Sequence, residues 1–240
     1  MEEWWSRPLE PVEVAVLDSG VDATHPDLAG RIAESYVIES INGRANWREI
    51  GAATDNDANG HGTGVASIIS KLAPNARIID VHILDQDNGC TSTCFLSALH
   101  RAVERKLKVI NLSLALRPRY GHWVRPLCEA AWRQGQIVVS AKRNELDSDL
   151  GLPAEFATSI SVDSEVMPDL RRFRFRPGEV IEFSAWGDNI TVAAKGGGYT
   201  TAGGNSFATP VLSGLCAVLL GAFPGLLPFE VLSVLKHNSI

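Results

Sequence analysis

Two polar residues in the first third of the chain have the surroundings of catalytic groups. Asp18 follows the apolar run VEVAVL, at the expected carboxyl end of a strand. His61 lies between Gly60 and Gly62 at the start of an apolar-periodic helix, so a partner could approach its imidazole closely enough for proton transfer. Taken alone, Asp18 is better interpreted as a turn or helix-capping residue, and His61 can be interpreted as a loop histidine without a role.

A third candidate lies near the carboxyl terminus. Ser206 stands at an expected helix start, with Pro210 in the first turn, where its missing N–H costs little. A hydroxyl there lies near free N–H groups that can stabilise a developing negative charge. Serine is also a favoured N-cap, but that leaves the nearby glycines unexplained. Close approach of another chain's backbone would require such residues, and they are Gly196, Gly197, Gly198, Gly203 and Gly204.

The segment before His61 imitates the start of a calcium-binding loop. Asp55, Asp57 and Gly60 fit that pattern, but Ala66 occupies the twelfth position, where a bidentate glutamate is required. No full set of oxygen ligands can be traced elsewhere, so the sequence predicts neither a metal nor a cofactor.

The three candidates occur in the order Asp, His, Ser, which is the order of subtilisin. The run DSG after a strand, then GHGTG and GNSFATP each opening a helix, resemble the subtilisin-like serine proteases, or subtilases. The resemblance covers about Val12 to Leu235, almost the whole chain. Further matching segments are His25-Pro26-Asp27-Leu28, Leu72-Ala73-Pro74-Asn75-Ala76, Val109-Ile110-Asn111-Leu112-Ser113-Leu114 and Asn144-Glu145.

The resemblance implies a role for each candidate. Ser206 would attack the carbonyl of a peptide bond, and His61 would take its proton and return it to the leaving amine. Asp18 would hold the imidazole tautomer and stabilise the imidazolium. Asn144 corresponds to the oxyanion residue of the family, whose side-chain amide acts with the Ser206 backbone N–H.

The same resemblance assigns a substrate-binding segment. Ser113 and Leu114 would lie beside an extended substrate and pair with its backbone as an added strand. Ala115 stands where the family usually has glycine. Because main-chain pairing tolerates many sequences, specificity has to come from the pockets.

Two cations depart from the family pattern at the main specificity pocket. Lys142 and Arg143 precede Asn144, where small residues are usual, and would line the pocket for the side chain before the cleaved bond. Long cations there would narrow the pocket or attract an acidic group, which predicts restricted specificity with Asp or Glu favoured. Alternatively they point into solvent, pair with local acids such as Glu145, or obstruct the site.

Six strands are predicted to position these residues. Short apolar β-branched runs alternate with amphipathic stretches, which favours strands covered on both faces of a parallel sheet. The strand candidates are Val12–Leu17, Arg77–Leu84, Leu107–Leu112, Gln136–Ala141, Ser159–Val162 and Asn189–Ala194. The helix candidates are His61–Lys71, Phe95–Arg105, His122–Gln134, Phe207–Ala222 and Phe229–His237.

This alternation predicts an α/β fold, a doubly wound, mostly parallel sheet with helices on both faces, in one domain. Working residues of such sheets lie outside the carboxyl ends of the strands. Residues 1–11 are read as an N-terminal arm, and residues 12–240 as a subtilisin-like peptidase domain.

One segment has a separate pattern. Phe173 and Phe175 alternate with Arg172, Arg174 and Arg176. Such alternation favours a hairpin with one solvated cationic side. Its functional alternative is an exosite for an acidic protein substrate.

The composition narrows the partners and the compartment. With 28 acidic and 22 basic residues the net charge is −6, which argues against nucleic acid. No apolar run approaches the roughly 18–20 residues of a membrane span. The acidic start MEEWWSRPLE is no secretory signal, and four cysteines are too few for a disulfide scaffold, although Cys90 and Cys94 are close enough to bridge. We therefore expect a cytoplasmic protein of open oligomeric state.

These observations predict a selective intracellular processing endopeptidase that acts on a peptide or protein substrate, with acidic substrates favoured. Two alternatives remain open. The chain could be a catalytically silent member of the fold that binds peptides or partners. It could also use the same acyl-enzyme for transfer, as a peptide cyclase does.

Overall fold

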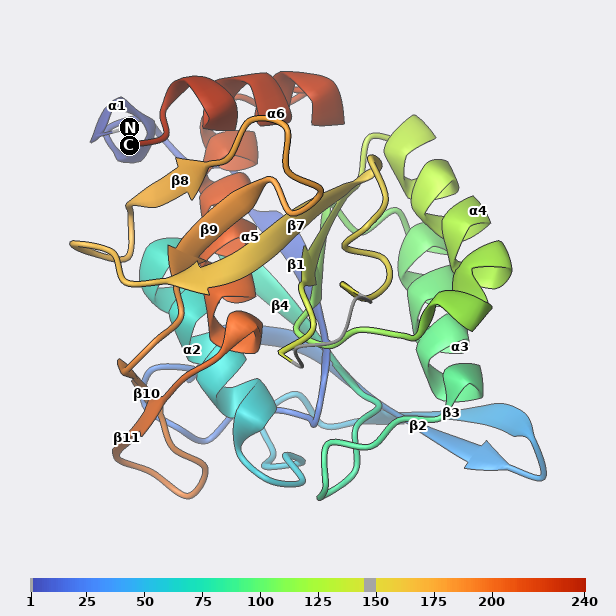
Figure 1. Cartoon of the computed structure of the whole chain (residues 1–240). Helices are drawn as coiled ribbons and strands as arrows, with labels where there is room; N and C mark the ends of the chain where they lie inside the picture. The colour runs from blue at the N-terminus through green and yellow to red at the C-terminus, as the bar shows by residue number, and fades with distance from the viewer. Residues whose placement is uncertain (1, 145–149) are drawn as a thin grey trace.

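The computed structural model describes residues 2–144 and 150–240 of the chain, with the side chain of Glu2 left out. Its centre is a nine-stranded sheet of order β3-β2-β4-β1-β5-β6-β7-β9-β8 (Figure 1). The strands are β1 (Val12–Asp18), β2 (Ile32–Ile41), β3 (Arg44–Ile50), β4 (Ala76–His82), β5 (Val109–Leu112), β6 (Ile137–Ala141), β7 (Ser159–Glu165), β8 (Phe173–Phe175) and β9 (Phe183–Trp186).

The central strands run parallel, and antiparallel hairpins close the two edges, β2 with β3 and β8 with β9. The helices are α1 (Glu2–Trp5), α2 (His61–Leu72), α3 (Ser92–Glu104), α4 (Gly121–Arg133), α5 (Asn205–Ala222) and α6 (Pro228–His237), with a 3₁₀ turn over Pro118–Tyr120. The predicted doubly wound α/β fold is confirmed.

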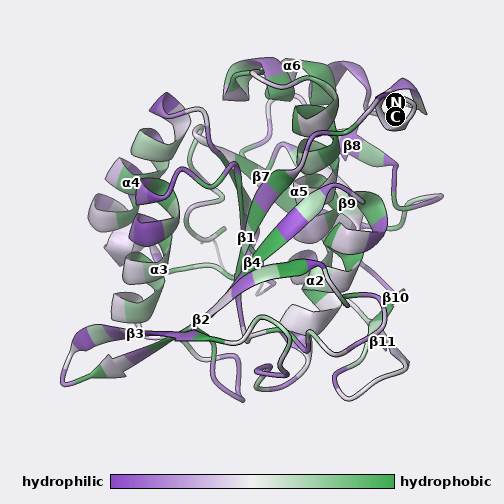
Figure 2. Cartoon of the chain, turned by 180° about the vertical axis from the view of Figure 1, so that it is seen from behind, coloured by the Kyte–Doolittle hydropathy of each residue, from purple (hydrophilic) through white to green (hydrophobic). Residues whose placement is uncertain are grey.

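Alternate residues of the central strands supply two separate cores. On β1, Val14 and Val16 face the core beneath α2 and α5, while Ala15 and Leu17 face the core beneath α3 and α4. In Figure 2 the outer helices α3 and α4 alternate hydrophobic green with hydrophilic purple, as expected for helices with one buried side. Both faces of the sheet are therefore covered, which explains the near-continuous apolar runs.

α5 is buried along its whole length and contacts β1, β5, β6, β7 and β9. Its 18 residues are long and apolar enough to span a membrane by length and composition, so the expectation that no run approaches that length is wrong. Of this stretch, 94% is buried inside the protein. The packing of the core accounts for its hydropathy.

One strand prediction needs correction. Asn189–Ala194 was expected among the sheet strands, but β10 (Ile190–Ala193) pairs only with β11 (Tyr199–Ala202), as a separate hairpin. Its turn contains Gly196, Gly197 and Gly198, each with a positive φ and open space around it. The positive φ angles of the turn explain why these three residues are glycines.

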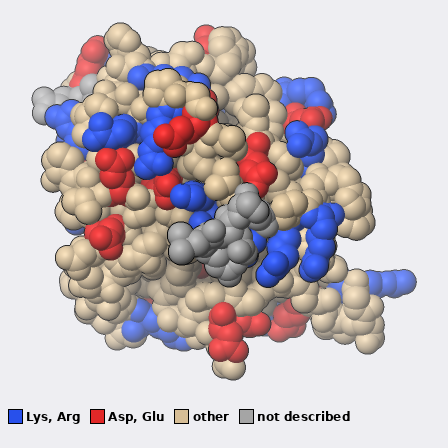
Figure 3. Space-filling model, viewed as in Figure 1, with Lys and Arg blue, Asp and Glu red and all other residues tan. Residues whose placement is uncertain are grey.

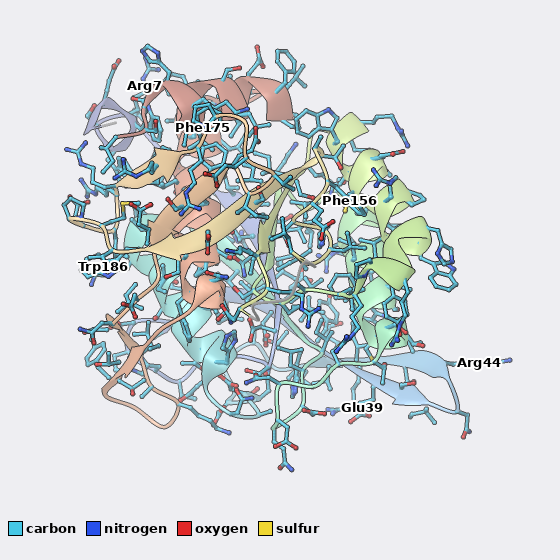
Figure 4. The ribbon with its side chains drawn as sticks, in the orientation of Figure 1. Arg7, Glu39, Arg44, Phe156, Phe175 and Trp186 are labelled. Atoms are coloured by element: carbon cyan, nitrogen blue, oxygen red, sulfur yellow. The ribbon has the colours of Figure 1, made fainter. Side chains whose placement is uncertain are left out.

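The hairpin at the β2 edge was not predicted, although the sequence contains its signal. Asn42 and Gly43 connect β2 to β3 with φ of 51° and 75°, as a two-residue turn with both φ positive requires. The hairpin at the opposite edge was predicted. Phe173 is fully buried, and Phe175, labelled in Figure 4, packs beneath α6, where Lys236 Nζ lies 4.6 Å from its ring.

The N-terminal residues are packed onto the body. Trp4 is 5% exposed and belongs to the core beneath α5, while Trp5 Nε1 donates to the Leu72 carbonyl oxygen at 2.9 Å. The arm therefore begins with a short helix that covers the end of α2.

Candidate active site

The carboxyl end of β1 and the start of α2 bring two candidate residues together. Asp18 is the last residue of β1 and is fully buried, and His61 is the first residue of α2. The His61 Nδ1–H donates to Asp18 Oδ1 at 2.7 Å, and the Ser19 backbone N–H donates to the same oxygen at 2.8 Å. Because Nδ1 carries the proton, Nε2 is the ring atom left to act as a base.

A second buried carboxylate fixes where α2 begins. Asp57 Oδ1 accepts from Ser19 Oγ at 2.7 Å and from the backbone N–H of Gly60 at 2.9 Å, and its Oδ2 accepts from the backbone N–H of Thr63 at 2.8 Å. These bonds satisfy N–H groups that a helix start leaves without partners. The segment read as an imitation of a calcium loop is thus the cap of the helix that carries His61. The sequence analysis missed this role of Asp57.

The surroundings of His61 control its protonation. Burial of the imidazole disfavours the charged form, but the charge and hydrogen bond of Asp18, with the charge of Asp57, outweigh burial and raise the pKa of His61. Phe207 packs against the ring, with the two centroids 5.0 Å apart. The residue is thereby suited to receive a proton during the reaction.

Ser206 lies in the same pocket as His61, at the first turn of α5. Its backbone carbonyl accepts from Ser113 Oγ at 2.7 Å, which ties the start of the helix to the segment after β5. Within the described residues no hydrogen bond joins Ser206 Oγ to the imidazole. Catalytic hydrogen bonds of this kind are often long without substrate and tighten in the complex.

The pocket occupies about 500 Å³, and every predicted substrate-binding residue lines it. Asn144 and Ser206 lie on its wall, as the predicted oxyanion donor and nucleophile require. Asn144 Oδ1 accepts from the backbone N–H of Asn205 at 3.0 Å, so the amide oxygen is engaged and Nδ2 remains to donate. The other predicted residues on this wall are Ser113, Leu114, Ala115, Lys142 and Arg143.

Lys142, one of the two cations on the pocket wall, forms an ion pair with a neighbouring acid. Lys142 Nζ lies 2.9 Å from Asp163 Oδ2, which Arg176 Nη1 also approaches to 3.1 Å. The charge of Lys142 is therefore already compensated by an acid, but the acid is Asp163. Glu145, the partner named from the sequence, lies outside the described residues.

Arg143 packs its aliphatic stem into the wall of the pocket. A Cβ atom at Gly151 would lie 2.6 Å from Arg143 Cγ and 2.7 Å from the Cβ of Ala115. Both distances are shorter than the contacts that Cβ atoms make in proteins. Arg143, Ala115 and Gly151 therefore fill this corner together, and Gly151 has to lack a side chain. The sequence analysis did not identify Gly151.

The arginines of the β8 segment are largely paired. Arg174 Nε lies 3.1 Å from Glu165 Oε1, and Arg176 interacts with Asp163 and Glu165. On the face shown in Figure 3, positive and negative side chains lie interspersed. The ion pairs weaken the exosite interpretation and favour the hairpin interpretation, in which the cationic side is partly neutralised.

A buried acid near the site carries a testable pH dependence. Asp80 on β4 is fully buried, and burial raises its pKa to about 7, against hydrogen bonds from Asn56 and Ser35 and with added repulsion from Asp57 and Asp18. The folded state therefore holds a proton that the unfolded chain has released above a pH of about 4. This group lowers the free energy of unfolding as pH rises from about 4 to about 7, by at most roughly 1.4 kcal/mol per pH unit.

We expect Asp80→Asn to remove that slope. Unfolding would be measured from pH 4.5 to 8 in a Ser206→Ala background, which prevents self-digestion. The substituted protein should gain stability relative to its parent as pH rises, with the difference levelling off above pH 7. A constant difference across the range would contradict the assigned proton.

The chain is similar to known proteins in both sequence and structure. The model of the subtilase family matches residues 10–239, so the chain belongs to the subtilase family. Over 222 residues it is 31% identical to the thermophilic serine proteinase of Bacillus sp. (strain AK1), covering 86% of this chain and 51% of that protein. It is 29% identical to subtilisin E of Bacillus subtilis (strain 168), covering 89% and 56% respectively. The chain thus spans about half the length of these curated relatives.

Solved structures show the same fold. Sphericase aligns with a TM-score of 0.79 at 24% identity, covering 95% of this chain and 83% of its own. A cold-adapted subtilisin-like serine proteinase aligns with a TM-score of 0.76 at 25% identity, covering 95% and 82%.

Proposed function

We propose that this chain is a serine endopeptidase that cleaves peptide bonds through an acyl-enzyme on Ser206. The observation that carries the proposal is the 2.7 Å bond between His61 Nδ1 and Asp18 Oδ1, at the edge of the pocket that Ser206 and Asn144 also line. Family membership supports the same activity.

In each proposed half-reaction His61 acts first as a general base and then as a general acid. Ser206 Oγ attacks the peptide carbonyl carbon while His61 Nε2 accepts its proton, and Asp18 stabilises the imidazolium. Asn144 Nδ2 and the Ser206 backbone N–H bind the oxyanion. The intermediate collapses as His61 protonates the leaving amine, and a water molecule then repeats the sequence to release the acid.

A profile of cleavage sites in a proteome-derived peptide library tests this activity, with Ser206→Ala as the control. Reaction of the pocket serine with a fluorophosphonate probe tests the nucleophile separately. Binding of peptides without labelling would instead indicate a silent member of the fold. Products that incorporate an added amine, detected by mass spectrometry, would indicate acyl transfer.

We further propose a narrow substrate range with an acidic residue favoured before the cleaved bond. Arg143 lines the pocket and its stem fills the corner beside Ala115, which leaves less room for a large apolar group. Lys142 lines the same pocket, with its Nζ 2.9 Å from Asp163 Oδ2.

Peptides that differ only at the position before the cut measure this preference. We expect Asp or Glu to give a higher kcat/KM than Leu or Phe. Arg143→Gly should reverse this order and change the ratio of the two kcat/KM values by about 10–100-fold. Arg133→Gln, which removes an exposed charge on α4, is the matched control and should leave the order unchanged. A wild-type preference for large apolar residues would contradict the proposal.

A selective processing role inside the cell is part of the same proposal. All four cysteines are free thiols in the structure, which supports a reducing compartment. The narrow pocket supports action on few proteins.

A further inference from the structure

The residue before the nucleophile connects three parts of the site. Asn205 is 6% exposed, and its side-chain amide uses all of its hydrogen-bonding groups. Its Nδ2 donates to the backbone carbonyl oxygens of Lys142 at 3.0 Å and Arg143 at 3.3 Å. Its Oδ1 accepts from the backbone N–H of Ser164 on β7 at 2.7 Å.

The backbone of Asn205 contacts the oxyanion residue itself. Its N–H donates to Asn144 Oδ1 at 3.0 Å. A side-chain amide has one oxygen and one N–H₂ group. Because the oxygen of Asn144 accepts from Asn205, its N–H₂ group is oriented away from Asn205 and can donate to a substrate. Asn205 therefore holds Asn144 in two ways. Its backbone N–H bonds to Asn144 directly, and its side-chain amide bonds to the carbonyl oxygens of the two residues that precede Asn144 in the chain.

We propose that Asn205 is a positioning residue that sets the oxyanion donor Asn144 at its working distance from Ser206. The proposal rests on the function proposed above and adds a residue to it. Asn205 and Ser206 are adjacent in α5, whereas Asn144 belongs to the segment after β6. The side-chain amide and the backbone N–H of Asn205 both join the two segments, so this residue helps to set the spacing between nucleophile and donor.

The magnitude of the effect follows from two considerations. Removing the amide leaves two carbonyl groups and one N–H of partly buried backbone without their partner, so the segment has to shift to regain hydrogen bonds. A displacement of about 1 Å in a positioning group can cost on the order of 100-fold in rate. The amide bonds to the backbone of Lys142 and Arg143 rather than to their pocket-lining side chains, and substrate pairing along the Ser113 segment does not use it, so kcat should fall by more than KM rises.

A cycle of variants tests the proposal with a chromogenic peptide. Asn144→Ala should lower kcat about 10²–10³-fold, a loss known from subtilisin. Asn205→Ala should lower kcat about 10–100-fold with KM within about threefold. If Asn205 acts through Asn144, the double variant should be within about threefold of Asn144→Ala. Multiplication of the two losses would overturn the proposal.

A matched control separates positioning from general stability. Gln136, at the opposite end of β6, also donates its side-chain amide to two backbone carbonyls, Ala102 at 3.1 Å and Leu107 at 2.9 Å. Gln136→Ala should lower Tm by an amount comparable to Asn205→Ala but leave kcat within about twofold. An equal loss of kcat in both variants would show that the effect is only structural.

Further measurements keep each outcome interpretable. Should Asn205→Ala fail to fold, Asn205→Asp, which has the same shape but cannot donate to the two carbonyls, takes its place in the cycle. Fluorophosphonate labelling of the wild type distinguishes failure of the proposed function from failure of the role proposed for Asn205. An unlabelled and inactive wild type means that the proposed function fails. A labelled, active wild type with multiplicative losses means that only the role of Asn205 fails.

Discussion

Ser206→Ala is expected to abolish labelling by a fluorophosphonate and to lower kcat by roughly 10⁶-fold. The value is taken from subtilisin, where loss of the nucleophile costs about 2 × 10⁶ in kcat. Without the hydroxyl no acyl-enzyme forms, and only binding and the oxyanion donors remain. Peptide hydrolysis and covalent labelling, measured on the same preparation, check the result.

The control for this substitution is another serine whose hydroxyl bonds to its own helix. Ser233 Oγ on α6 donates to the Phe229 carbonyl oxygen at 2.8 Å and is exposed. Ser233→Ala should retain full labelling and hydrolysis. Persistent labelling of Ser206→Ala would place the nucleophile elsewhere and refute the proposed function.

Asp18→Asn is expected to lower kcat by about 10⁴-fold while substrate binding is retained. An asparagine amide presents a donor where His61 Nδ1–H needs an acceptor, so the wrong imidazole tautomer is favoured and Nε2 no longer acts as a base. The magnitude is that of the corresponding change in a chymotrypsin-type triad. The variant is close in shape to the wild type, so loss of packing does not explain such a deficit.

Asp18→Asn should also shift the pH dependence of the residual activity. In the wild type the Asp18 carboxylate raises the pKa of His61 against the effect of burial. Activity requires the neutral imidazole, so it should rise with pH through that elevated pKa. Without the carboxylate, burial dominates and the pKa falls, which shifts the residual activity profile to lower pH.

The exposed carboxylate Asp27 provides the comparison, because it bonds only to the Tyr199 hydroxyl in the described structure. Asp27→Asn should change neither kcat nor the pH profile. An unshifted profile in Asp18→Asn would contradict the assigned electrostatic role.

The elements that carry the triad could be predicted because their signals are local. VEVAVLD predicts a buried strand that ends at Asp18, and the two helix starts follow from glycine-flanked His61 and from Ser206 before an apolar run. Parallel strands then place these ends at one edge of the sheet. Boundaries differ by at most three residues, as with α3, which begins at Ser92 rather than Phe95.

The side-chain partners could not be predicted, because they depend on strand register. Ala141 on β6 pairs with Val162 on β7, which places the next residues, Lys142 and Asp163, side by side. No local pattern reports that alignment. The sequence alone leaves several acidic residues as possible partners of Lys142, including the nearby Glu145.

Asn205 illustrates the same limit. In the sequence it is one residue of the run GNSFATP, with no pattern that marks a positioning role. Its hydrogen bonds reach Lys142 on one segment and Ser164 on another, and both contacts require the ends of β6 and β7 to be assembled beside α5. Its role is a property of the tertiary structure.

The helix that presents Ser206 is enclosed by protein along its whole length. Its amide protons can reach solvent only when the surrounding layers come apart, so it belongs to the last part of the molecule to open. The edge hairpin of β2 and β3, whose outer strand is largely exposed, can fray without disturbing it. Heat inactivation should therefore coincide with cooperative melting of the entire domain, since the nucleophile has no separate, earlier way to be displaced.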